Sequence, residues 1–345
     1  MKTRTWVQCL PLVLAVYVSP APCPAEPIDR AGEVAFEPTA RETVVPARFH
    51  LDKHTFAFEQ KFQPTSSNVF ELSDVTFPSP VVTPEPNNNT VHCEYFRPTA
   101  AGRHPGVIVL HILGGDFNLS RLFCRALAHH GTAALFVKMP YYGPRRQPGS
   151  PARMVSMDPQ ETIRGMTQAV LDVRQATAWL AAQGEIDPEQ LGIMGISLGG
   201  ITAALASTAE PRLQNICLLL AGGDVGRVAW DVPYLKSLRE HWLASGGTKE
   251  TFLAAMQAVD PVTYGVNVKG RRILMLNARH DELIPRECTE SLWRAFGEPE
   301  IIWWDAGHYT AARYLFDGLA KTTAFFQASA SEAREPASAG ESSPR

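Results

Sequence analysis

The sequence predicts an α/β fold, with a mostly parallel central sheet flanked by helices, antiparallel N-terminal edge strands and a small helical insertion. The first observation behind this prediction is an alternation, from Gly106 onward, of short apolar runs with amphipathic helical patterns, which is typical of a parallel sheet covered on both faces. The second is the composition: 45% hydrophobic and 19% charged residues in a chain of 345 are ordinary for a globular protein with a sizeable core.

Residues 1–25 have the pattern of a secretory signal peptide. Lys2 and Arg4 precede an apolar stretch at 6–18, and Ala25 is a small residue before a possible cleavage point. The apolar stretch is shorter than the roughly 20 apolar residues of a membrane-spanning helix, although an uncleaved anchor is the alternative. We therefore expect a secreted or periplasmic protein without a membrane span after cleavage.

Residues 26–104 form an N-terminal extension that is rich in Pro, Thr and Asn. Aromatic and β-branched residues bounded by turn residues predict antiparallel edge strands in this extension. The expected edge strands are 54–62, 69–77 and 90–96. The sequence Asn88-Asn89-Thr90 matches a glycosylation sequon, but a polar turn is the simpler interpretation of consecutive asparagines.

The main α/β domain is expected over residues 105–329, followed by a small, polar and disordered tail at 330–345. The expected strands are 107–112, 133–138, 191–196, 213–220, 272–277 and 300–304, and the expected helices are 120–130, 159–183, 198–207, 286–296 and 311–327. An insertion at about 224–268 interrupts the alternation with two or three helical patterns. Its aromatic residues, among them Trp230, either pack as core or form a cap over a substrate pocket.

The sequence Gly195-Ile196-Ser197-Leu198-Gly199 joins an expected strand to an expected helix, which is the context of a nucleophile elbow. In such a turn the serine backbone is strained and its side chain points out of the sheet, while glycine two residues to either side avoids a collision. An ordinary glycine turn is the alternative, but the flanking strand and the alanine-rich helix favour a catalytic Ser197.

A serine hydroxyl needs a neutral imidazole to take its proton and a carboxylate to hold that ring in the correct tautomer. In this architecture the chain order is serine, acid, histidine. His308 follows the last expected strand and Asp281 follows the strand before it, so both are expected at the carboxyl edge of the sheet. Glu282 and Asp305 are rival acids, and His241 and His280 are the other histidines after Ser197.

An oxyanion hole needs backbone N–H groups at the position where negative charge develops. Leu198, at the start of a helix, is expected to supply one. Leu113, or Gly114 beside it, is expected to supply the other from the loop after 107–112, where His111 is interpreted as a structural residue. Candidates for substrate contact are Tyr141, Tyr142, Arg145 and Trp230, with a solvated turn as the alternative for the first three.

Charge and cysteine patterns argue against two other kinds of site. A formal net charge of -3 without lysine- or arginine-rich runs leaves no basic surface for nucleic acid. Cys93, Cys124, Cys217 and Cys288 are widely spaced and form no C-x-x-C pair, so no metal cage is expected. Cys124 and Cys217 lie in apolar periodic segments and are predicted to be buried, while disulfide pairing stays open.

These motifs resemble those of the α/β-hydrolase superfamily over about residues 105–327: the elbow at Ser197, the Asp281 loop with Ile284-Pro285, and Gly307-His308, in that order. Within the superfamily the chain is similar to dienelactone-hydrolase-like proteins, acetyl xylan esterases and the catalytic domain of prolyl oligopeptidases. It has serine where dienelactone hydrolases proper have cysteine, and residues 26–105 are too few for the β-propeller of prolyl oligopeptidases.

The resemblance implies a serine hydrolase, of carboxylesterase type, that forms an acyl-enzyme on Ser197 and needs no metal or organic cofactor. The implied substrates are small-molecule or polysaccharide-linked esters, and the oligomeric state stays open. A peptidase or amidase with the same triad is one alternative. A non-catalytic binding protein on a hydrolase scaffold is another.

Overall fold

The computed structural model describes residues 29–332 except 116, 157 and 232–235. Within this part of the chain, ten strands form one sheet in the order β1-β2-β3-β4-β6-β5-β7-β8-β9-β10. The strands are β1 Arg30–Phe36, β2 His54–Gln63, β3 Phe70–Pro78, β4 Thr90–Pro98, β5 His104–Leu110, β6 Ala133–Val137, β7 Ile186–Ile196, β8 Asn215–Leu219, β9 Arg272–Ala278 and β10 Glu300–Trp304. The predicted signal peptide lies outside the described residues.

The sheet is parallel from β6 to β10 and antiparallel at its N-terminal side. Strands β6, β5, β7, β8, β9 and β10 pair in parallel, whereas β1 to β4 pair antiparallel and join the rest through β4 and β6. This arrangement confirms the predicted fold class. Strand β1 was not predicted, because only Val34 and Phe36 of its seven residues are buried and the alternation is too short to recognise.

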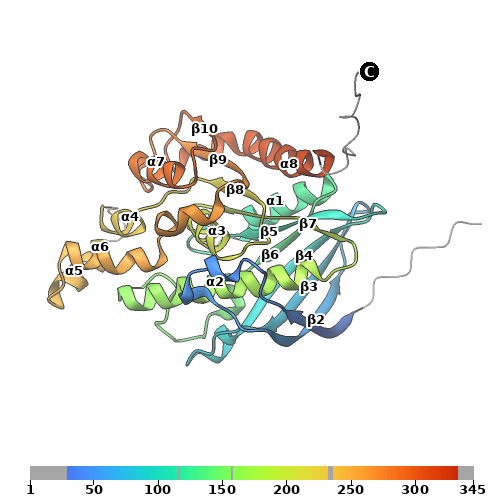
Figure 1. Cartoon of the computed structure of the whole chain (residues 1–345), viewed down its shortest axis with the longest axis horizontal. Helices are drawn as coiled ribbons and strands as arrows, with labels where there is room; N and C mark the ends of the chain where they lie inside the picture. Colours follow the sequence, from blue (N-terminus) through green and yellow to red (C-terminus); the bar gives the residue numbers. More distant parts are fainter. Residues whose placement is uncertain (1–28, 116, 157, 232–235, 333–345) are drawn as a thin grey trace, which may run out of the picture.

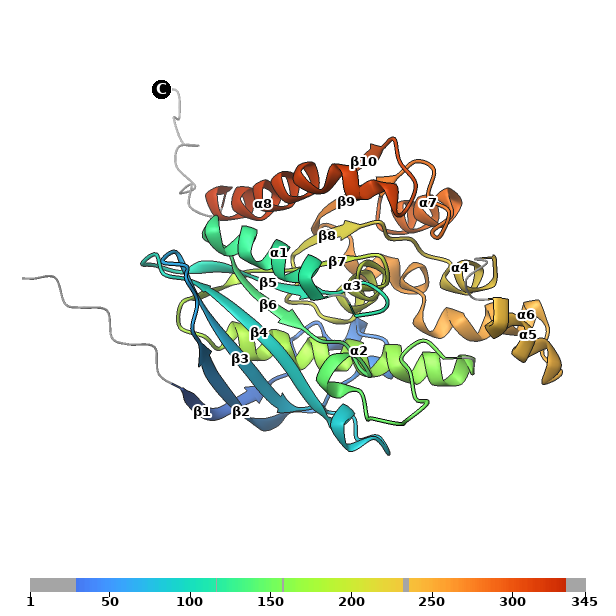
Figure 2. The same ribbon diagram turned by 180° about the vertical axis from the view of Figure 1, so that it is seen from behind.

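Helices cover both faces of the sheet (Figures 1 and 2). The α-helices are α1 Phe117–His129, α2 Pro159–Ala181, α3 Leu198–Ala209, α4 Val225–Asp231, α5 Lys236–Ala244, α6 Lys249–Met256, α7 Arg286–Ala295 and α8 Leu315–Glu332. Short 3-10 helices are η1 Glu42–Val44, η2 Ala47–Phe49, η3 Pro86–Asn89, η4 Gly143–Arg145, η6 Gln257–Val259, η7 Pro261–Val268 and η8 Thr310–Tyr314.

The core lies in two layers, one on each face of the sheet. Residues of α2, α3 and α7 form one buried cluster, and residues of α1 and α8 form the other. Successive residues of β5 enter opposite layers: Ile108 and Leu110 join the first, and Val107 and Val109 the second. Side chains on a strand alternate between faces, so burial on both faces explains why this strand is apolar throughout.

Helices α4, α5 and α6 lie between β8 and β9 in the chain and project at one end of the molecule (Figure 1). Trp230 of α4 packs against Phe252 of α6, with ring centroids 5.4 Å apart. Both side chains are buried, at 9% and 1% exposure. The aromatic residues of this segment therefore contribute to its own packing.

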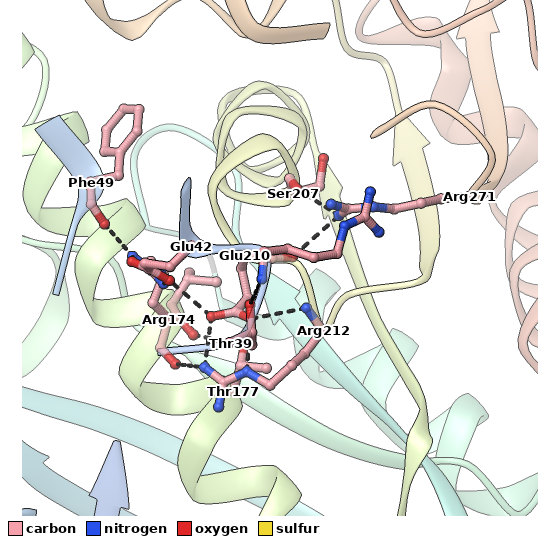
Figure 3. Close-up of polar contacts among 11 residues, drawn as sticks. Thr39, Glu42, Phe49, Arg174, Thr177, Ser207, Glu210, Arg212 and Arg271 are labelled. Carbon is pink, nitrogen blue, oxygen red and sulfur yellow. Dashed lines mark hydrogen bonds and ion pairs between the residues drawn. The ribbon is translucent and has the colours of Figure 1, made fainter. Parts of the chain in front are cut away.

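A buried network of ion pairs connects the N-terminal segment around η1 to α2 and to the end of α3 (Figure 3). Arg174 of α2 donates to the Glu42 carboxylate at 2.8 and 2.6 Å and also to the carbonyl oxygen of Phe49. Its Nε lies 3.5 Å from Glu210, which Arg212 binds at 2.7 Å. The side chains of Arg174 and Glu210 are 1% and 0% exposed, so each charge depends on its partner.

Three further features bear on the predictions. The four cysteines in the described residues are free and buried, which confirms the burial predicted for Cys124 and Cys217. Asn88 is fully buried and donates to Gln168 at 2.8 Å, so its side chain belongs to a packed polar turn and is closed to glycosylation. Among the described helices, none combines the length and the apolar character needed to cross a membrane.

Candidate active site

Ser197 lies at the turn between β7 and α3, at the carboxyl edge of the sheet. Its backbone has φ 55° and ψ -119°, a left-handed conformation that is strained for a residue with a side chain. A Cβ on Gly195 would lie 2.1 Å from the carbonyl oxygen of Gly199, and a Cβ on Gly199 would lie 2.5 Å from that of His111. Glycine is therefore required at both positions, as the elbow predicts.

A chain of hydrogen bonds connects Ser197, His308 and Asp281. His308 Nε2 is 2.9 Å from the Ser197 hydroxyl oxygen, and His308 Nδ1 is 2.8 Å from Asp281 Oδ2. The carboxylate accepts the Nδ1 proton, which leaves Nε2 as a lone-pair acceptor toward the hydroxyl. The two side chains are only 8% and 2% exposed, so this pairing is shielded from water.

Asp281 is itself fixed by backbone groups. Its other oxygen, Oδ1, accepts from the amides of Leu283 at 2.9 Å and Ile284 at 2.7 Å. Bonds to two amides hold the carboxylate plane, and the plane sets the direction in which Oδ2 meets the imidazole. The turn at 281–284 therefore orients His308.

The rival acids have other partners. Glu282 accepts from the backbone amide of His308 at 2.7 Å and does not contact the ring. Burial raises the pKa of Glu282, but the amides of His308 and Tyr309 outweigh it and leave the pKa below its ordinary value. Asp305 pairs with His280 at 3.0 Å on the exposed surface. Only the Asp281 carboxylate, of these three, is bonded to the His308 imidazole.

The predicted oxyanion donors lie beside the hydroxyl. Leu198 is the first residue of α3, and the Ser197 side chain does not cap this helix. Leu113 and Gly114 line the same cavity as Ser197, in the loop after β5. A helix N-terminus favours negative charge nearby, and Gly114 has a positive φ of 89°, so both segments are compatible with the predicted oxyanion hole.

His111 stabilises the loop that carries Leu113. The Met139 amide donates to His111 Nε2 at 3.1 Å, so the ring proton is on Nδ1, which donates to the Ile112 carbonyl at 2.8 Å. Burial lowers the pKa of His111 to about 4. Both ring nitrogens are bonded to backbone groups and neither is free to exchange a proton with a substrate, in agreement with the structural role predicted for His111.

The proposed substrate-contact residues lie away from this cavity. Arg145 is fully buried and pairs with Asp172 at 2.8 Å, so its charge is neutralised inside the protein. The Tyr142 ring packs edge-on against the His111 ring, with centroids 4.7 Å apart. The backbone amide of Tyr141 donates to the Asn88 side chain at 2.9 Å, and Trp230 packs in the α4–α6 segment. None of the four lines the cavity at Ser197, so we do not include them in the candidate site.

The cavity at Ser197 has a volume of about 440 Å³ and walls that are mostly apolar. It is lined by Ile112, Leu113, Gly114, Leu119, Phe123, Ile196, Ser197, Leu219, Leu220, Leu283, Trp304, His308, Tyr309, Ala311, Ala312, Leu315 and Gly318. Sequence reasoning missed the wall residues from α1 and α8, because an apolar residue on an amphipathic helix gives no sign of whether it faces core or cavity. Within the described residues, no group of three or more His, Cys, Asp or Glu side chains could hold a metal ion.

Comparison with known proteins shows two matches to family models. A model described as "Alpha/beta hydrolase domain containing 18" matches residues 51–230. A model of the prolyl oligopeptidase family matches residues 165–331. The second match begins within α2 and ends within α8, and it includes all three residues of the hydrogen-bonded chain.

Two curated relatives come from Mycobacterium tuberculosis strain H37Rv and are themselves uncharacterized. Rv2627c is 31% identical over 175 residues, covering 49% of this chain and 40% of that protein. Rv2307c is 24% identical over 211 residues, covering 60% of this chain and 63% of that protein. The chain thus spans less than two thirds of the length of either relative.

Solved structures with the same fold include two acetyl xylan esterases. The enzyme from Paenibacillus sp. R4 superposes with a TM-score of 0.61 at 18% identity, covering 75% of this chain and 88% of that one. Acetyl xylan esterase 1 from Thermoanaerobacterium sp. JW/SL YS485 gives 0.59 at 17% identity, covering 76% and 87%. At these identities the likeness concerns the fold.

Proposed function

The chain belongs to the alpha/beta hydrolase domain containing 18 family, and from this premise we propose that it is a serine hydrolase that cleaves carboxylic esters. The observation that carries the proposal is the continuous hydrogen-bonded chain from the Ser197 hydroxyl through His308 to Asp281. Such a chain activates an alcohol as a nucleophile.

In the proposed reaction, Ser197 Oγ attacks the ester carbonyl while His308 Nε2 takes the hydroxyl proton. Asp281 stabilises the imidazolium that forms. The amides of Leu198 and Leu113 hold the negative oxygen of the tetrahedral intermediate, and removing one such donor costs about 10²–10³-fold in rate. His308 then gives its proton to the leaving alcohol, and water cleaves the acyl-enzyme by the same steps.

A peptidase or amidase is the second candidate, favoured by the match to the prolyl oligopeptidase family. The same three residues would serve both reactions, since an amide differs from an ester in its leaving group. The cavity walls favour the ester: they are mostly apolar, whereas a peptide carries backbone amides that need hydrogen-bond partners when they are buried. Acetylated small molecules or polysaccharides are the ester substrates with which a first screen would begin.

Labelling with a fluorophosphonate probe, together with hydrolysis of short-chain aryl esters, tests the proposal. We expect labelling and turnover in the wild type and neither in Ser197→Ala. Glu282→Gln is a matched control, because it changes a neighbouring carboxylate that does not contact the ring. Labelling that persists in Ser197→Ala removes this serine from the mechanism. Faster turnover of peptide substrates than of esters favours the peptidase. No labelling of the folded wild type favours a non-catalytic binding protein.

Export is a separate part of the proposal and depends only on the sequence of residues 1–25. A charged start, an apolar stretch and small residues before Glu26 support a secreted or periplasmic location. Mass spectrometry of the protein from its native host gives the test: a mature chain that starts at Glu26 is expected, and an intact N-terminus would contradict it.

A further inference from the structure

The cavity beside Ser197 is too large for an acetyl group alone. A methyl group is close in size to one water molecule, whose share of the liquid is about 30 Å³. The cavity holds about 440 Å³, so an acetyl group would leave most of it empty. Apolar walls around an empty volume favour an apolar occupant, because each contact replaces unfavourable hydration.

From His308 the cavity extends along one face of the helical segment formed by η8 and α8. Ala311, Leu315 and Gly318 line it in succession at helical spacing, from η8 into α8. With a rise of about 1.5–2 Å per residue, Gly318 lies on the order of 10 Å further along than Ala311. A chain of roughly eight carbons with bonds of about 1.5 Å has a similar extended length.

The far end of the cavity is closed and the near end is open. The side chains of Trp304 and Leu219, which face Gly318, are 6% and 3% exposed, whereas Leu113 and Tyr309, near Ser197 and His308, are 38% and 69% exposed. The alcohol must leave before water attacks the acyl-enzyme, and it can do so through the open end. The acyl group stays bonded to Ser197 through both steps, so a closed cavity suits the acyl group.

Gly318 determines how deep this cavity is. A Cβ at Gly318 would already touch Trp304 Cη2 at 3.3 Å and Leu219 Cδ2 at 3.8 Å, so Gly318 packs directly against these walls and a larger side chain must project into the cavity or displace them. Trp304 is held in place: its indole N–H donates to Asp317 at 2.8 Å, and its ring stacks on Tyr314 with centroids 5.6 Å apart. The wall opposite Gly318 therefore has little freedom to move aside.

From these contacts we infer that the cavity is an acyl pocket for unbranched acyl chains of about eight carbons, and that Gly318 is the residue that limits their length. This inference rests on the proposed ester hydrolysis at Ser197. It adds the substrate class, a medium-chain acyl ester, and a specificity-determining position far from the reacting atoms.

The first arm of the test measures kcat/KM for p-nitrophenyl acetate, butanoate, hexanoate, octanoate and dodecanoate. In the wild type we expect an increase of up to roughly fourfold for each added methylene as far as octanoate, and a decrease at dodecanoate. Gly318→Leu should lower octanoate hydrolysis at least about thirtyfold, the value of two to three methylenes, and leave acetate hydrolysis within about twofold.

Three further variants separate pocket blockage from a general effect on α8. Ala320→Leu places the same side chain on the exposed side of the helix and should leave the whole profile unchanged. Gly318→Ala should shorten the preferred chain only slightly. Leu315→Phe lies one turn nearer to His308, so it should impose a cut-off at shorter chains and keeps the inference testable if Gly318→Leu does not fold.

The second arm separates this inference from the proposed function. Binding of octanoate, measured by isothermal titration calorimetry, needs no turnover and should weaken at least tenfold in Gly318→Leu relative to Ala320→Leu. If no ester is cleaved but octanoate binds in this way, the acyl pocket stands and the proposed reaction falls. Three results would show that the acyl-pocket inference is wrong. The first is a kcat/KM for esters that is independent of acyl chain length, and the second is a kcat/KM that depends instead on the length of the alcohol in alkyl acetates. The third is equal affinity of octanoate for Gly318→Leu and Ala320→Leu.

Discussion

Replacing Asp281 with asparagine tests the proposed role of the carboxylate with little change in shape. Asp281 Oδ1 accepts two backbone amides, from Leu283 and Ile284, and Oδ2 accepts His308 Nδ1. An asparagine would keep its oxygen toward the two amides, because the flipped amide would leave both donors unsatisfied at about 1–3 kcal/mol each. Its NH₂ group would then face His308 Nδ1.

The expected loss of activity follows from the tautomer. An NH₂ donor opposite Nδ1 requires the ring proton to move to Nε2, and Nε2–H cannot accept the proton of Ser197. In a Ser-His-Asp triad this change lowers kcat by about 10⁴-fold, which corresponds to roughly 5.4 kcal/mol of activation free energy at 1.36 kcal/mol per tenfold. Because Oδ1 keeps its two amide donors, the free energy of unfolding should change by less than about 1 kcal/mol.

The assay is the steady-state kcat for an aryl ester, with urea denaturation of the same samples. Asp281→Ala is the companion variant: it should lose comparable activity and also about 2–6 kcal/mol of stability, since two amides lose their acceptor. Glu282→Gln should stay within about threefold of the wild type, because a glutamine oxygen still accepts the His308 amide. A kcat for Asp281→Asn within tenfold of the wild type would refute the tautomer argument.

Three other predictions concern the scaffold. Gly199→Ala should destabilise the fold by about 3 kcal/mol or more in thermal unfolding, because its Cβ would meet two carbonyl oxygens at 2.5 and 2.6 Å; an unchanged Tm would show that the elbow can relax. Arg174→Met should cost about 3–5 kcal/mol in urea denaturation, because Glu42 loses its arginine and the buried Glu210 keeps only Arg212. Arg164→Met on the exposed side of the same helix should stay within about 0.5 kcal/mol. Burial raises the pKa of Glu210, but the neighbouring arginines outweigh it and leave the pKa below its ordinary 4.5. The ionised Glu210 carboxylate therefore stabilises the fold above pH 4.5, and this contribution is lost as the pH falls below that value. The free energy of unfolding should decline less steeply in acid for Glu210→Gln than for the wild type. An equally steep decline would contradict this reasoning.

The sequence alone supports most of the secondary structure and the nature of the nucleophile. Strand and helix patterns depend on residues a few positions apart, so alternating burial and the Gly-x-Ser-x-Gly turn can be read directly. The exceptions follow the same logic. In β1 only two residues are buried. Strand β7 begins at Ile186, five residues before the predicted start at 191, because residues 187–190 give no apolar run.

Which residues contact one another in the site depends on the tertiary structure. Asp281, Glu282 and Asp305 are similar carboxylates within 25 positions of one another, and only packing determines which of them faces the His308 ring. Arg145 has the sequence context of a solvated loop, yet it is buried against Asp172 of α2. The acyl cavity is bounded by α1 and α8, some 200 residues apart. Local periodicity is set by neighbours along the chain, whereas a cavity and its depth are set by side chains that become neighbours only when the sheet and helices pack together.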